Sequence, residues 1–104
     1  MDNQLSSVTV SYIWGTIYFA KKGCFCTVGH WPTYLTNIAA NYKYEYANVI
    51  PSGFRPYYDM RVVSWNVNQN NMVLVEFLTT GTITVLSSLG GNHQIHYSFT
   101  YLLA

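Results

Sequence analysis

Charged side chains are the scarcest feature of this 104-residue chain. Asp, Glu, Lys and Arg together make up 9% of its residues, whereas a soluble domain typically has about 25%. The formal net charge is +1, and the five basic residues are scattered along the sequence. A surface that follows a phosphate backbone needs clustered basic residues, so a nucleic-acid partner is not expected. So few charges also suggest that a neighbouring chain covers part of the uncharged surface.

Long apolar runs are also missing. None approaches the 18 residues typical of a membrane-spanning helix, and residues 1–10 lack the basic-then-apolar pattern of a signal peptide. We therefore expect neither membrane insertion nor export by the common route. Polar residues 1–6 are interpreted as a linker and residues 7–104 as one domain, whose 50% hydrophobic and 17% aromatic content is enough for a single core.

Cysteine is nearly absent, and the two that occur stand in Cys24-Phe25-Cys26. In a strand they would share one face about 6.5–7 Å apart, too far for a comfortable disulfide. A zinc half-site is conceivable, but the usual C-x-x-C spacing is missing, so we favour two small buried apolar residues. No Asp- and Asn-rich loop indicates calcium. No metal or cofactor is predicted.

Helical periodicity is the last absence, since no segment keeps it over three turns. Alternation of β-branched and aromatic residues instead predicts seven or eight strands. They span residues 7–13, 15–21, 24–28, 42–46, 58–65, 72–78, 82–86 and 93–103. Residues 72–78 are nearly all apolar and are predicted to be covered on both sides, and Gly90-Gly91 is a hairpin signal. A loop is expected over residues 29–41, with a short helical turn within residues 35–40. The pattern predicts an all-β fold, a small antiparallel β-barrel or jelly-roll-like sandwich.

Residues 48–56 (NVIPSGFRP) lie between two of the predicted strands. Pro51 and Pro56 lack an amide donor and cannot be central ladder residues. Gly53 can supply a positive φ for a turn. We interpret the stretch as a structured crossover that Ile50 and Phe54 fix to the core.

Four segments resemble a known family. Residues 22–28 (KGCFCTV), 50–56 (IPSGFRP), 79–85 (TTGTITV) and 95–102 (IHYSFTYL) resemble, in this order, the hairpins, crossover and terminal strand of receptor-binding and baseplate proteins of tailed phages of Gram-positive bacteria. Residues 31–46 have no counterpart that can be aligned.

The resemblance implies a β-barrel head domain at the phage tail tip, which acts at the bacterial surface. Such heads are usually homotrimers that assemble with other tail or baseplate proteins and bind cell-wall saccharides. The matched residues carry over as determinants of the fold. Arg55 is therefore interpreted as a structural arginine that hydrogen-bonds loop carbonyls rather than as a ligand residue.

Catalysis has little support in the sequence. Glycoside hydrolysis needs two carboxyls about 5–10 Å apart, and nothing in the sequence shows that Asp59 and Glu76 converge. No G-x-S-x-G nucleophile elbow occurs either. We predict that the protein is not an enzyme.

Asp59, Arg61 and Trp65 are the first candidate binding residues. On one strand face they would offer an acceptor pair, a forked donor and a stacking ring, which suit a sugar's hydroxyls and apolar C–H faces. The alternative is an exposed Asp59–Arg61 pair of small energetic value, with Trp65 capping the barrel.

His30, Trp31 and His96 are further candidates. The first two lie in a loop, where exposure suits binding, although core packing of Trp31 is the alternative. His96 falls on a polar strand face, where it would contact a ligand, a trimer neighbour or only solvent.

Taken together, these features predict a non-catalytic phage adhesin domain that recognises a host saccharide. Two alternatives stay open. One is a structural trimerisation or docking domain of a tail fibre or baseplate without sugar binding. The other is a monomeric carbohydrate-binding module of a bacterial enzyme.

Overall fold

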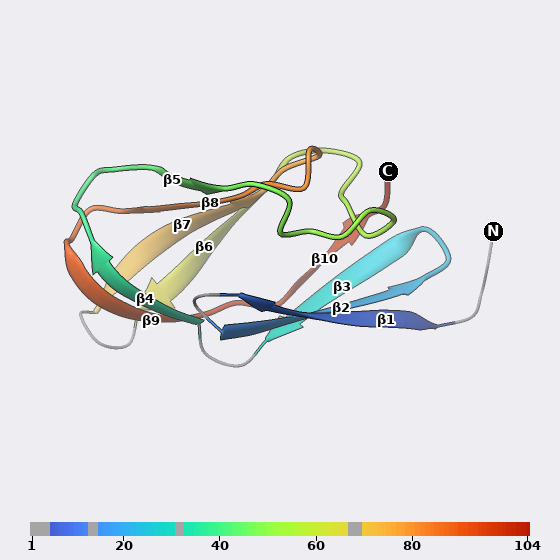
Figure 1. The fold of residues 1–104 in the computed structure, drawn as a ribbon, viewed down its shortest axis with the longest axis horizontal. Coiled ribbons are helices and arrows are strands. Elements are labelled where there is room, and N and C mark those ends of the chain that lie inside the picture. The colour runs from blue at the N-terminus through green and yellow to red at the C-terminus, as the bar shows by residue number, and fades with distance from the viewer. Residues whose placement is uncertain (1–4, 13–14, 31–32, 67–69) are drawn as a thin grey trace.

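A computed structural model of Met1–Ala104 describes residues 5–12, 15–30, 33–66 and 70–104. These residues form ten strands and no helix, in two antiparallel sheets (Figure 1). The strands are β1 (Ser6–Tyr12), β2 (Gly15–Lys22), β3 (Phe25–His30), β4 (Thr33–Ile38), β5 (Tyr44–Tyr46), β6 (Met60–Asn66), β7 (Asn71–Phe77), β8 (Ile83–Ser87), β9 (Gly91–His96) and β10 (Phe99–Leu102). The predicted all-β class is confirmed. No helix in the described part is long and apolar enough to cross a membrane.

The two sheets make an elongated sandwich of 43 × 22 × 20 Å. The four-stranded sheet has the order β1-β2-β3-β10, and the six-stranded sheet has the order β4-β9-β6-β7-β8-β5. The chain passes from one sheet to the other between β3 and β4 and again between β9 and β10 (Figure 1).

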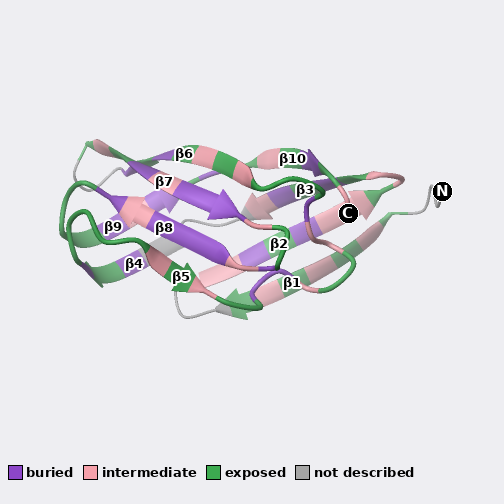
Figure 2. Cartoon of the chain, turned by 90° about the horizontal axis from the view of Figure 1, so that it is seen from above, coloured by how far each residue is buried: buried purple, intermediate pink, exposed green. Residues whose placement is uncertain are grey.

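The core lies between the inner faces of the sheets, and Figure 2 shows buried residues concentrated along β7 and β8. Alternation selects these residues, because every second side chain of a strand points to the same face. Phe77 is fully buried near the centre of an aromatic cluster. Its ring centroid lies 6.2 Å from that of Phe19, 5.9 Å from that of Tyr97 and 4.9 Å from that of Phe99. This cluster joins the two sheets.

The crossover of residues 48–56 is folded as predicted. Phe54 N donates to Pro51 O at 3.0 Å, and Gly53 has the positive φ, 89°, that the turn requires. Ile50 is fully buried, and the Phe54 ring lies 6.3 Å from that of Phe19. Both predicted anchors therefore contact the core.

Arg55 fixes the crossover from within. Its Nε donates to Ile50 O at 3.1 Å, which confirms the interpretation of a structural arginine. Val49 N and Ile50 N both donate to Gly81 O at 3.0 Å, so the crossover also binds the turn between β7 and β8.

The same crossover reaches the other segments of the family resemblance. Tyr57 N donates to Leu102 O at 2.8 Å, and Ala104 N donates to Arg55 O at 3.0 Å. Lys21 Nζ, from the β2–β3 hairpin, donates to Gly53 O at 3.0 Å. The crossover thus joins the β7–β8 turn, the β2–β3 hairpin and the end of β10 at one end of the sandwich.

The predicted loop over residues 29–41 and its helical turn are wrong over residues 33–38, because Thr33–Ile38 forms strand β4 against β9. The register shifts between Leu35 and Ile38, and Asn37 has a φ of 54°. Such a bulge interrupts the alternation by which a strand is recognised, which explains the error.

The predicted single strand over residues 93–103 is also wrong, because it is divided into β9 and β10 in different sheets. Between β9 and β10, buried Tyr97 and exposed Ser98 continue the alternation of inward and outward side chains. The sequence pattern therefore does not show where β9 ends and β10 begins. The Gly90-Gly91 hairpin signal fails as well, since β8 and β9 are not paired. These differences raise the strand count from seven or eight to ten.

Both cysteines are free thiols. Cys26 is fully buried on β3, as predicted, and burial raises the pKa of its thiol. Cys24 is only half-buried and lies in the turn before β3 rather than in the strand. The two side chains are therefore not equivalent.

Candidate functional site

The outer face of the six-stranded sheet carries three of the six predicted site residues, Arg61, Trp65 and His96. On β6, Arg61, Val63 and Trp65 are exposed, while the residues between them face the sandwich interior. Trp65 keeps 45% of its surface exposed, and Val63 keeps 60%. The prediction that Arg61 and Trp65 share one strand face is confirmed.

Trp65 lies in a cross-strand row. Its register partners are Met72 on β7 and His96 on β9, and directly opposite residues share a face at about 4.5–5.5 Å between Cβ atoms. Met72 and His96 are both exposed. We call Val63, Trp65, Met72 and His96 the Trp65 platform.

The exposure of Met72 corrects one prediction. Residues 72–78 do not form a strand covered on both sides, because Met72 is 59% exposed and Leu74 only half-buried. The sequence does not reveal that Met72 is exposed, because apolar residues occupy both faces of this strand and the inner and outer positions then look alike. Only strand pairing reveals that Met72 extends the platform.

A charged cluster adjoins the platform along β6. Arg61 Nε donates to Glu76 Oε2 at 2.8 Å, and Lys43 Nζ lies 2.8 Å from Glu76 Oε1. Thr84 Oγ1 donates to the same Oε1 at 2.8 Å. The Glu76 side chain is only 6% exposed, whereas that of Arg61 is 75% exposed. The buried carboxylate therefore holds an exposed guanidinium in place.

These contacts also fix the protonation of Glu76. The hydrogen bond from Lys43, followed by that from Thr84, lowers the pKa of Glu76 from 4.5 to about 2, against the opposing effect of burial. The hydrogen bond from Arg61 adds to the lowering. The carboxylate stays ionised well into acid.

Glu76→Gln is expected to remove an acid-sensitive part of the stability. Because the pKa of Glu76 is lower in the folded state, its contribution is complete above about pH 4.5 and is lost as the pH falls towards 2. Solvent screens both cations, so we expect a loss of about 1–2 kcal/mol above this window. Urea unfolding of wild type and Glu76→Gln, at pH values above and below this range, measures the difference in the free energy of unfolding.

The matched control is Glu45→Gln, because Glu45 is an exposed carboxylate on β5, which lies beyond β8 in the same sheet. It should change the free energy of unfolding above this window by no more than about 0.5 kcal/mol. Equal acid dependence of wild type and Glu76→Gln would contradict the assignment.

Asp59 is not brought together with Arg61 and Trp65 in the way predicted. Its Oδ1 accepts a hydrogen bond from Thr79 N at 2.9 Å, so it caps the turn between β7 and β8. The alternative Asp59–Arg61 pair is wrong too, since the ion pair of Arg61 within the described residues is with Glu76. The carboxylate that pairs with Arg61 is that of Glu76 on the neighbouring strand β7. Because the two residues are far apart in the sequence, the sequence alone does not reveal this pair.

The remaining candidates, His96, His30 and Trp31, lie in three different parts of the chain. His96 joins the platform directly opposite Trp65. His30 ends β3 in the other sheet, and Trp31 lies outside the described residues. Neither is therefore assigned to the platform.

A buried polar network supports the platform from the inside. Asn66 Nδ2 donates to Asn71 Oδ1 at 2.8 Å and to His93 Nδ1, while Asn66 Oδ1 accepts from Gln94 N at 3.2 Å. His93 Nε2 donates to Leu89 O at 2.9 Å. These bonds give the Asn66 amide one orientation and pair both ring nitrogens of His93.

The network matters because the ladder between β6 and β9 is short. It contains two residue pairs, Trp65 with His96 and Asn66 with Ile95. The Asn66 side chain therefore adds contacts at the very junction that holds Trp65 beside His96.

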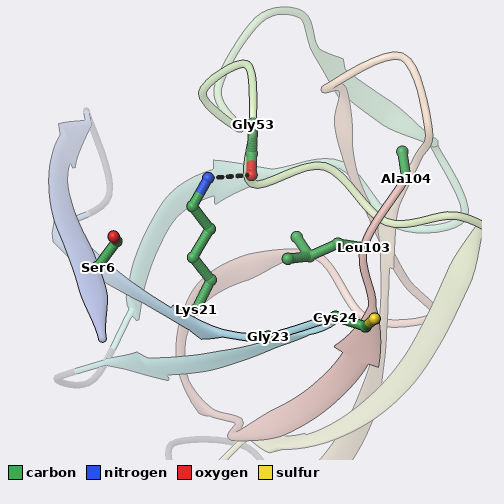
Figure 3. Close-up of a pocket in the computed structure, with 7 residues that line it drawn as sticks. All are labelled: Ser6, Lys21, Gly23, Cys24, Gly53, Leu103 and Ala104. Atoms are coloured by element: carbon green, nitrogen blue, oxygen red, sulfur yellow. Dashed lines mark hydrogen bonds between the residues drawn. The ribbon is translucent and has the colours of Figure 1, made fainter. Parts of the chain in front are cut away.

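A pocket of about 410 Å³ lies at the other end of the sandwich, where the crossover meets the β2–β3 hairpin (Figure 3). It is lined by Ser6, Lys21, Gly23, Cys24, Gly53, Leu103 and Ala104. Lys21 is the one charged side chain of this lining, and its ammonium binds Gly53 O and lies 4.5 Å from the centre of the Phe54 ring. Lys21 thus mainly fixes the crossover, which makes the Trp65 platform the stronger candidate site.

No group of three His, Cys, Asp or Glu residues in the described ranges is arranged to hold a metal ion. Comparisons of the chain with models of known protein families and with curated proteins find no match.

Proposed function

We propose that this protein is a non-catalytic receptor-binding domain that recognises a bacterial surface saccharide through the Trp65 platform. The observation that carries the proposal is the half-exposed Trp65 ring on the open face of a sheet, between His96 and Met72. An exposed tryptophan in a row of exposed apolar side chains is typical of a binding surface.

The chemistry of the platform fits a sugar. The apolar C–H face of a pyranose ring stacks on an indole, while its hydroxyls need donors and acceptors at the rim. His96 offers a ring nitrogen, and Arg61 offers guanidinium N–H groups from a side chain that Glu76 holds in place. The face thus combines a stacking surface with polar groups on both sides.

The biological setting rests on the family resemblance of residues 22–28, 50–56, 79–85 and 95–102. Parts of these segments form the structural junction at the far end of the sandwich, whereas Arg61, Val63, Trp65 and Met72 lie outside all four segments, so this part of the outer face is free to vary with the ligand. We propose that the domain lies at a phage tail tip and attaches to the host wall.

Trp65→Ala is expected to weaken saccharide binding about tenfold or more, because truncation removes the stacking surface. A glycan array and titration with polysaccharides purified from Gram-positive cell walls would identify the ligand and measure the loss. Phe25→Ala is the matched control, since Phe25 is 57% exposed on β3 of the other sheet. It should bind like wild type.

Two results would contradict the proposal. One is equal affinity of wild type and Trp65→Ala for the same glycan. The other is failure of the folded protein to bind any wall fraction, which would favour a docking domain of a tail fibre or baseplate.

A further inference from the structure

Three of the four sheet edges have features that prevent further strand pairing. β4 carries the bulge at Asn37, and β5 is only three residues long. The end of β10 is covered by the crossover, through the bridge between Pro56 and Leu103 and the bond from Tyr57 N to Leu102 O. Bulges, short strands and covering loops are the usual protections of an edge.

The fourth edge, β1, has none of these features. It is seven residues long (SSVTVSY), contains no charge, proline or glycine, and pairs with β2 without a register shift from Ser6 to Tyr12. On its other side no strand pairs with it among the described residues. None of residues 6–11 of β1 is buried (Figure 2). Its backbone donors and acceptors therefore form an open ladder.

The sequence of β1 is symmetrical about its midpoint. Residues 7–11 read Ser-Val-Thr-Val-Ser, with Thr9 at the centre of both this palindrome and the strand. Val8 and Val10 face inward and are only partly buried against the core, while Ser7, Thr9 and Ser11 are exposed. A strand that reads the same in both directions complements a copy of itself that runs antiparallel.

We propose that the partner of this edge is a second copy of the chain, paired through β1 about a two-fold axis at Thr9. In this register Thr9 lies opposite the partner's Thr9, and Val8 lies opposite the partner's Val10. Apolar side chains then meet on the inner face and hydroxyls on the outer face, as antiparallel pairing requires. The two four-stranded sheets become one sheet of eight strands.

The remaining edges decide the size of the assembly. Because β1 is the one unprotected edge of the described chain, an isologous contact through it closes at two copies. The interface uses none of the Trp65 platform, which lies on the other sheet. The proposal therefore goes beyond the proposed function and does not depend on saccharide binding.

The test is Thr9→Lys in the 104-residue chain. Wild type should show a concentration-dependent mass that approaches about 24 kDa, twice the 11.9 kDa of one chain, by light scattering or sedimentation. Two lysines directly opposite each other repel, so Thr9→Lys should remain a monomer at every concentration. Thr36→Lys is the matched control, because Thr36 is an exposed threonine on the bulged edge strand β4. It should dimerise like wild type.

An equal mixture of Thr9→Lys and Thr9→Glu tests the register itself. Each variant alone should be monomeric, and the mixture should recover the dimer, because opposite charges then face each other across the axis. Far-UV circular dichroism of each variant verifies that it is folded. The proposal is overturned if wild type is monomeric throughout, if it forms the trimer that the family resemblance implies, or if Thr9→Lys dimerises unchanged.

Discussion

Gly81→Ala is expected to destabilise the domain by about 2–4 kcal/mol. Gly81 has a φ of 89°, a conformation that an L-residue adopts only with strain. An added Cβ would also lie 2.5 Å from Arg55 Nε. Either the turn or the guanidinium must move, and Arg55 is the residue that holds the crossover through Ile50 O.

The matched control is Gly29→Ala. Gly29 lies in β3 outside the left-handed region of φ, and the space where a Cβ would be added is open. Urea unfolding should show a large decrease in midpoint for Gly81→Ala and little change for Gly29→Ala. Similar midpoints for the two variants would mean that the crossover does not depend on the contact between Gly81 and Arg55.

Asn66→Ala is the second large change, with an expected loss of about 3 kcal/mol. Asn66 is fully buried, and its amide serves three groups: Asn71 Oδ1, His93 Nδ1 and Gln94 N. Truncation leaves all three without that partner, and a buried polar group that loses its hydrogen bond costs about 1 kcal/mol or more. We also expect weaker saccharide binding, because the β6–β9 junction positions Trp65 beside His96.

Ser64→Ala is the control for this prediction. Ser64 is buried two residues earlier on the same face of β6, but its Oγ has no hydrogen-bond partner among the described residues. Removing that hydroxyl should leave the free energy of unfolding unchanged or raise it by about 1 kcal/mol. If both variants lost the same stability, packing rather than the amide network would explain the role of Asn66.

Local rules were enough to predict much of this fold. Alternation correctly placed Arg61 and Trp65 on one face of β6, and proline and glycine chemistry correctly identified the crossover at Pro51–Phe54 as structured. Both inferences depend on neighbours within a few residues. The division of the last predicted strand at Tyr97 was not detectable, because a change of sheet can keep the alternation intact.

The candidate site was likewise predictable only for residues that lie close together in the sequence. Arg61 and Trp65 share a strand, so their common face followed from the sequence. The contacts that complete the site join β6 to other strands: Met72 and His96 beside Trp65, and Glu76 beneath Arg61. Register between distant strands decides these contacts, and no single sequence pattern specifies it.

The placement of β10 beside β3 also bears on how the chain folds. Ser98 Oγ donates to Val28 O across seventy residues of sequence, so the sheet begun by β1, β2 and β3 is completed only after the six-stranded sheet has been synthesised. The four-stranded sheet is therefore not a contiguous segment, because β4 to β9 lie between β3 and β10 in the sequence, and closing such a long loop slows folding. We expect refolding on the millisecond-to-second timescale in one cooperative step, during which the two sheets form together.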